Sequence, residues 1–141
     1  MCRNAAAYKM GHSDLVYEAE RFVHLTSSPS RFANSEEAHE FLSYVLNTQW
    51  FNNRWPKTGR KGVSVTFSRH AAAWSNVDTN QIWLPFWACN TMTLLHELAH
   101  ICSHDTEHGQ SFRDAHLALV KRFMGADAAR AYKHALIALG V

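Results

Sequence analysis

Apolar residues recur at three- and four-residue steps in two segments near the start of the chain, as they do on one face of an amphipathic helix. The first segment starts at Asp14 and ends in a Ser-Pro turn, and its apolar positions are Leu15, Val16, Ala19, Phe22 and Val23. The second follows a capping residue, Asn34 or Ser35, and its apolar positions are Ala38, Phe41, Leu42, Val45 and Leu46. We therefore expect two helices here, preceded by a flexible tail over residues 1–12.

The middle of the chain changes to a period of two. Residues 52–62 are polar and contain Pro56, Gly59 and Gly62, which predicts a loop. Val63, Val65 and Phe67 then alternate with polar residues, as in a half-buried strand. Residues 71–74 and 81–84 are two further short strand candidates, and Pro85 ends the second of them. Short strands joined by short turns predict a small antiparallel sheet.

Three helices are predicted after the sheet, at about residues 91–103, 109–124 and 127–139. The first is apolar on two opposite flanks, which predicts that it lies buried between two layers. One flank carries Met92, Leu95, Ala99 and Cys102, and the other carries Leu94, Leu98 and Ile101. The whole pattern predicts an α+β fold, with residues 1–141 forming one domain around this central buried helix.

The polar stripe of the central helix contains the sequence His-Glu-Leu-Ala-His, from His96 to His100. Two histidines four residues apart lie one turn apart on the same side of a helix, so both imidazoles can bind one metal ion. Glu97 points to the same side but is offset from the ligand position, where it can accept a proton from a metal-activated water. We expect His96 and His100 to bind zinc and Glu97 to be the catalytic base.

A catalytic zinc ion requires a third protein ligand and an open position for water. Three histidines follow the motif. His104 continues the same helical stripe, where tetrahedral geometry would be poor. His116 lies among apolar positions of the next helix, where a buried structural histidine is the commoner outcome. His108 follows the point where the central helix must end, so the returning chain can present it from the other side of the metal. We favour His108 as the third ligand.

Residues 96–100 and the following His-Gly-Gln-Ser-Phe, residues 108–112, resemble the SprT-like and minigluzincin zinc metallopeptidases. The order of segments 16–20, 82–85, 96–100 and 108–112 also resembles a small family of metallohydrolases from actinobacteria and their phages. The resemblance implies a zincin-like core, one zinc ion held by His96, His100 and His108, and Glu97 as the base. It further implies that residues 82–85 form an edge strand that lines the cleft and pairs with an extended peptide substrate.

The chain departs from related groups at informative positions. Ser103 and Thr106 stand where metzincins require Gly and His. SprT-like enzymes that act on DNA-bound proteins usually carry a cysteine zinc module. The three cysteines of this chain, Cys2, Cys89 and Cys102, include no Cys-x-x-Cys pair and do not form such a module. A formal net charge of +2 gives no indication of a nucleic-acid partner. The odd cysteine count, and no evident signal peptide or membrane span, predict a cytoplasmic protein.

The favoured function is therefore a zinc metallopeptidase that acts on a peptide or protein substrate. A zinc hydrolase of small amides or esters, and a binding module with a structural zinc ion, remain alternatives. A closed deep pocket would favour the small-molecule enzyme, and an open groove beside residues 81–84 would favour the peptidase. Tyr132, His134 and His116 are candidate oxyanion donors. Asp105, Glu107 and Asp114 are predicted to be ordinary surface acids, although each could orient a ligand imidazole.

A cluster of four aromatic residues lies shortly before the central helix. They could line a substrate cleft, but at least two are expected in the core, as large aromatic side chains usually are. The four are Trp74, Trp83, Phe86 and Trp87. Cys102, on an apolar flank of the central helix, is expected to be a packed thiol and not a nucleophile.

Overall fold

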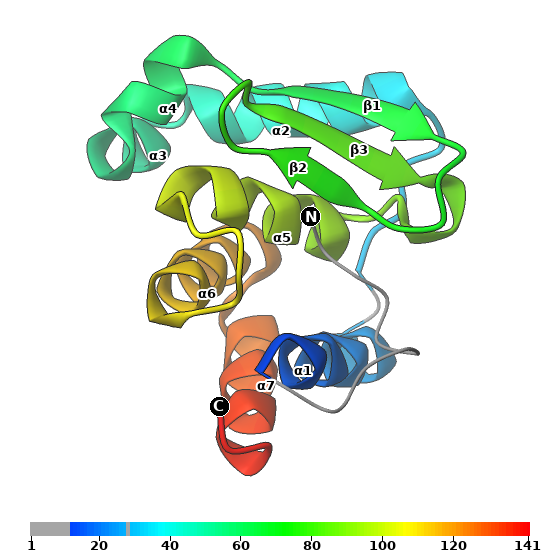
Figure 1. Cartoon of the computed structure of the whole chain (residues 1–141), viewed down its shortest axis with the longest axis vertical. Helices are drawn as coiled ribbons and strands as arrows, with labels where there is room; N and C mark the ends of the chain where they lie inside the picture. The colour runs from blue at the N-terminus through cyan, green and yellow to red at the C-terminus, as the bar shows by residue number, and fades with distance from the viewer. Residues whose placement is uncertain (1–11, 28) are drawn as a thin grey trace.

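The computed structural model describes residues 12–27 and 29–141, and this part of the chain has the α+β class that the sequence predicts (Figure 1). All but the last residue of the predicted tail, 1–12, lies outside the described residues. The elements before the sheet are α1 (His12–Ser27), α2 (Ser35–Asn47), α3 (Gln49–Arg54) and α4 (Pro56–Lys61). The sheet consists of β1 (Ser64–Ser68), β2 (Trp74–Asn76) and β3 (Gln81–Pro85). The elements after it are the short 3-10 helix η2 (Phe86–Ala88), α5 (Thr91–Ser103), α6 (Gln110–Met124) and α7 (Ala126–Ala138).

The predicted loop over residues 52–62 is wrong, because helices α3 and α4 occupy most of this segment. The Thr48 hydroxyl caps α3 by accepting a hydrogen bond from the Phe51 amide at 3.2 Å. Pro56 is the first residue of α4, where its missing N–H costs nothing, and Gly62 follows the last turn with φ +80°. The Pro and Gly that suggested a loop therefore mark the two ends of a short helix.

The sheet is mixed, so the predicted antiparallel sheet is wrong in part. Its strand order is β1-β3-β2, with β3 parallel to β1 and antiparallel to β2. After β1 the chain forms β2 at the opposite edge of the sheet. It then returns as β3, which lies between β1 and β2. This excursion supplies the connection that two parallel strands need. It also makes residues 81–85 the central strand and leaves β2 as an edge.

Helix α5 lies between the sheet and helix α6 (Figure 1). All its residues from Thr91 to Cys102 are buried except Thr93, which agrees with its two apolar flanks. Its start is fixed by Asn90, whose side-chain oxygen accepts hydrogen bonds from the Thr93 amide at 2.9 Å and the Thr93 hydroxyl at 3.1 Å. The buried apolar side chains of the helices and sheet form one hydrophobic cluster around α5.

Replacing Asn90 by alanine is expected to lower the free energy of unfolding by about 1 kcal/mol, because the first turn of α5 loses its side-chain cap. Chemical denaturation of the metal-free protein measures this change. Asn90→Asp is the matched control, since aspartate caps helices as well as asparagine does and should retain most of the stability. Equal losses in both variants would contradict the capping role.

The expectation that at least two of the four aromatic residues lie in the core is wrong. Trp74 and Trp83 stack in parallel across β2 and β3, with ring centroids 3.7 Å apart, and both are only half-buried. Phe86 and Trp87 in η2 are 59% and 63% exposed. All four therefore lie on or near the surface of the sheet region. Among the helices that the structure describes, none has the length and apolar character needed to cross a membrane.

Candidate metal centre

The structure brings together the three histidines that the sequence selects. His96 and His100 lie one turn apart on α5, and His108 lies in the loop between α5 and α6. Each pair of ring centroids is 4.9 or 5.0 Å apart, so the three imidazoles surround a common point. The Nε2 atoms of His96 and His108 are 3.0 Å apart. All three side chains are buried, and one nitrogen from each lies within 4.8 Å of the others, so the group could hold a metal ion.

A hydrogen bond made by one ring nitrogen of His100 determines which of its two nitrogens is available to a metal. His100 Nδ1 lies 2.5 Å from the backbone carbonyl oxygen of Asp105. Because a carbonyl only accepts, this ring donates from Nδ1–H and its Nε2 carries no proton. Burial lowers the pKa of His100 to about 4 and that of His108 to about 2. Both rings are therefore neutral near pH 7, the form in which imidazole binds metals.

The loop that carries His108 is shaped by the side chain of Asp105. Its carboxylate accepts hydrogen bonds from the amides of Glu107 and Gly109 at 2.9 and 3.1 Å and from the Ser111 hydroxyl at 3.2 Å. A Cβ atom at position 109 would lie 2.8 Å from Asp105 Oδ2, so any other residue would force the Asp105 carboxylate to shift. Asp105 is thus more than the surface acid that we predicted, because its backbone orients His100 and its side chain holds the loop.

His104 and His116, the two alternatives to His108, do not join His96 and His100 in the group of three. His104 ends α5 in the left-handed conformation, with φ +53°, and is exposed. His116 on α6 is fully buried, and its Nδ1 lies 3.0 Å from the Tyr132 hydroxyl. The structure therefore groups His108, and neither of these, with His96 and His100.

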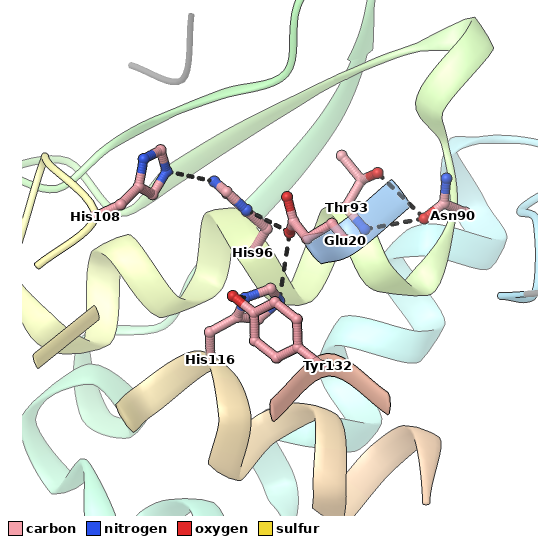
Figure 2. A network of polar contacts seen from close by, with 7 residues as sticks. All are labelled: Glu20, Asn90, Thr93, His96, His108, His116 and Tyr132. Atoms are coloured by element: carbon pink, nitrogen blue, oxygen red, sulfur yellow. Dashed lines mark hydrogen bonds and ion pairs between the residues drawn. The ribbon is translucent and has the colours of Figure 1, made fainter. Parts of the chain in front are cut away.

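Glu20, which the sequence analysis did not single out, reaches the centre from α1. Its Oε1 lies 2.5 Å from His96 Nδ1 and 3.7 Å from His116 Nε2 (Figure 2). Glu20, His96 and His116 form a second buried group that could hold a metal ion. Burial raises the pKa of the Glu20 carboxyl well above its usual value and lowers the pKa values of His96 and His116 well below theirs.

Two aromatic rings pack on the histidines. The ring of Tyr17, from α1, stacks on His96 at a centroid distance of 5.4 Å and meets His108 edge-on at 5.3 Å. Phe112 is completely buried, and its ring lies 4.4 to 4.8 Å from the rings of His96, His100 and His108. The imidazoles are thus supported from several sides before any ion binds.

Glu97 is 1% exposed and follows His96 on α5. A buried carboxylic acid is expensive unless its surroundings stabilise it, so its position beside the histidine cluster indicates a role there. Its assignment as catalytic base stays a prediction.

The other predicted candidates are not grouped with the three histidines. Tyr132 contacts His116, and His134 is exposed on α7. Asp114 is exposed and bonds with Gln110. Cys102 is buried, and burial raises the pKa of its thiol, as expected of a packed side chain that does not act as a nucleophile.

Comparison of the chain with protein-family models, with curated proteins and with solved structures finds no match.

Proposed function

We propose that this protein is a zinc-dependent hydrolase that cleaves peptide bonds. The observation that carries the proposal is the convergence of three buried, neutral imidazoles, two of them on the same helix as the buried Glu97. Two nitrogens bound to one ion at about 2.1 Å lie about 3 to 3.5 Å apart at angles near 90–110°. The 3.0 Å between Nε2 of His96 and Nε2 of His108 agrees with this range.

Zinc is the metal that best suits this donor set. Neutral imidazole nitrogens favour zinc over magnesium or calcium, which prefer oxygen ligands. Three protein ligands are also the number found in catalytic zinc sites, which keep a further position for water or substrate. His96, His100 and His108 would hold the ion. When bound, zinc acts as a Lewis acid that makes water more acidic and polarises a carbonyl group.

Glu97 would then perform the proton transfers of peptide hydrolysis. Its carboxylate accepts a proton from water as the water oxygen forms a bond with the carbonyl carbon of the substrate. It passes this proton to the amide nitrogen as the carbon–nitrogen bond breaks, so the leaving group departs as a neutral amine. Its burial next to His96 on α5 supports this role, because a buried carboxyl group needs a polar function or partner there.

The edge of the sheet supports a peptide as the substrate. Residues 82–85, expected at an edge, lie in the central strand, and β2 takes the edge position next to α5. On the side of β2 away from β3, the described part of the chain has no further strand. An extended peptide could therefore add to β2 by main-chain hydrogen bonds. We further propose that the helix carrying the histidine pair and the small sheet above it form the zincin-like core that the resemblance to SprT-like and minigluzincin peptidases implies.

Metal content measured by elemental analysis tests the proposal first. We expect about one zinc ion per chain in the wild type and a strong loss in His108→Ala, which lacks one of three ligands. His104→Gly is the matched control, because it removes a neighbouring exposed histidine and glycine suits its left-handed backbone.

Zinc retained by His108→Ala would place the third ligand elsewhere. A wild-type protein that binds no metal after reconstitution with zinc would overturn the proposal. With zinc bound, a screen of peptide libraries against small amides and esters separates the peptidase from the other hydrolases.

A further inference from the structure

The polar contacts around His96 continue beyond the three proposed ligands. They run from His96 on α5 to Glu20 on α1, then to His116 on α6 and Tyr132 on α7 (Figure 2). Helix α1 and the three consecutive helices α5, α6 and α7 thus contribute one polar side chain each to a single buried line. Such a line in an apolar interior is costly unless its members stabilise one another or a bound group.

The distances distinguish two explanations of the group Glu20, His96 and His116. If the group held a second ion, the ligand atoms of Glu20 and His96 would each lie about 2.0–2.1 Å from it and so about 3 Å or more from each other. The observed separation of Glu20 Oε1 and His96 Nδ1 is 2.5 Å, which is within hydrogen-bonding distance and too short for two ligands of one ion. The geometry therefore favours a hydrogen bond between these atoms over a shared metal.

We propose that Glu20 is a positioning residue for the metal centre, in that its carboxylate accepts a hydrogen bond from His96 Nδ1–H and so directs His96 Nε2 toward His108. The inference rests on the zinc site of the proposed function. A carboxylate in this position fixes the tautomer and orientation of a ligand imidazole and increases its basicity. The backbone carbonyl of Asp105 orients His100 in the same way. The Nδ1 atoms of two proposed ligands are therefore held by different parts of the chain, α1 and the loop after α5.

The neighbours of Glu20 hold its carboxylate in place. On α1 it shares the buried face with Val16, Ala19 and Val23, and Tyr17 from the same helix stacks on His96. His116 contacts the carboxylate from the side of α6 and is itself held by the Tyr132 hydroxyl. A glutamate anchored in this way loses little side-chain freedom when the metal binds, so the orientation of His96 is set beforehand.

Zinc affinity, measured by competition with a chromophoric chelator, tests the inference in the chain of residues 1–141. We expect Glu20→Ala to weaken zinc binding by about 10- to 100-fold. Glu20→Gln retains an acceptor oxygen and nearly the same shape, so it should keep most of the zinc affinity of the wild type. This variant also provides a test if Glu20→Ala folds poorly. Glu18→Ala is the matched control, because Glu18 lies on the same helix but pairs with Arg21 near the surface.

A second readout is the imidazole N–H proton of His96 in the NMR spectrum of the zinc-loaded protein. We expect a slowly exchanging, downfield signal in the wild type and in Glu20→Gln, and its loss in Glu20→Ala. Wild-type affinity and an unchanged signal in Glu20→Ala would overturn the inference while leaving the zinc site intact. Two zinc ions per chain, one of them lost in His116→Ala, would overturn it in favour of a second metal site. Failure of the wild type to bind zinc would instead overturn the proposed function itself.

Discussion

Replacing Glu97 by glutamine is expected to lower kcat by about 10²- to 10⁴-fold, the range that a positioned general base contributes. Glutamine has almost the same size but cannot accept the proton from water. Since Glu97 is not one of the three convergent histidines, zinc content should remain at the wild-type level. The rate is measured on the best peptide found in the screen, with zinc content measured on the same samples.

Glu107→Gln is the control for the Glu97 variant. Glu107 is an exposed acid in the loop before His108, and only its backbone amide is bonded to Asp105. Its replacement should leave the rate unchanged. If Glu97→Gln retained full activity with zinc bound, Glu97 would not be the base. A protein that binds zinc but hydrolyses nothing in the screen would point to the binding module with a structural ion.

Replacing Phe112 by alanine is expected to lower the free energy of unfolding of the metal-free protein by about 3–5 kcal/mol. Its ring is fully buried and packs on His96, His100 and His108, so its removal leaves a cavity in the core. The same cavity lets the imidazoles move, and zinc affinity should fall as well. Denaturant unfolding and chelator competition measure the two effects.

Phe51→Ala separates the two effects of the Phe112 substitution. Phe51 on α3 is just as buried, and its ring packs on Trp55. We expect a comparable loss of stability without the loss of zinc affinity in the folded protein. If both variants weakened zinc binding equally, Phe112 would have no specific role in supporting the ligands.

The helices and the central motif could be predicted because their signals are local. The apolar residues on both flanks of α5 predict a buried helix, and the helix is buried in the structure. His108 could be predicted as the third ligand because it follows the end of α5, where the chain can reverse and present this side chain to the histidine pair. The residues of the proposed zinc site were thus within reach of the sequence alone, although their roles stay predictions.

The direction of the strands could not be predicted in the same way. Nothing in the alternation of residues 63–67 or 81–84 indicates that β2 passes to the far side of β3 before the chain returns. The pairing depends on contacts between segments that are distant in sequence. The loop prediction for residues 52–62 failed for a different reason. Pro and Gly occur both in loops and at the ends of short helices, so they do not distinguish the two.

Glu20 was missed although a signal was present. It follows Val16 by four residues and precedes Val23 by three, so it lies on the apolar face of α1. A glutamate at such a position needs a buried partner, and this could have marked it as part of a polar site. Which partner it has, however, depends on the packing of α1 against the rest of the chain, and that information is not local.

The line of polar groups from Tyr132 to His96 has a consequence for the order of events during protein synthesis. Helix α1 packs on α7, and both contribute to this line. On a ribosome, α1 emerges early, but α7, the helix on which it packs, is made last. The metal ligands on α5 and after it are therefore translated before Glu20 can dock. We expect the nascent chain to bind zinc weakly until α7 leaves the exit tunnel, so that tight metal loading is delayed until the domain has closed.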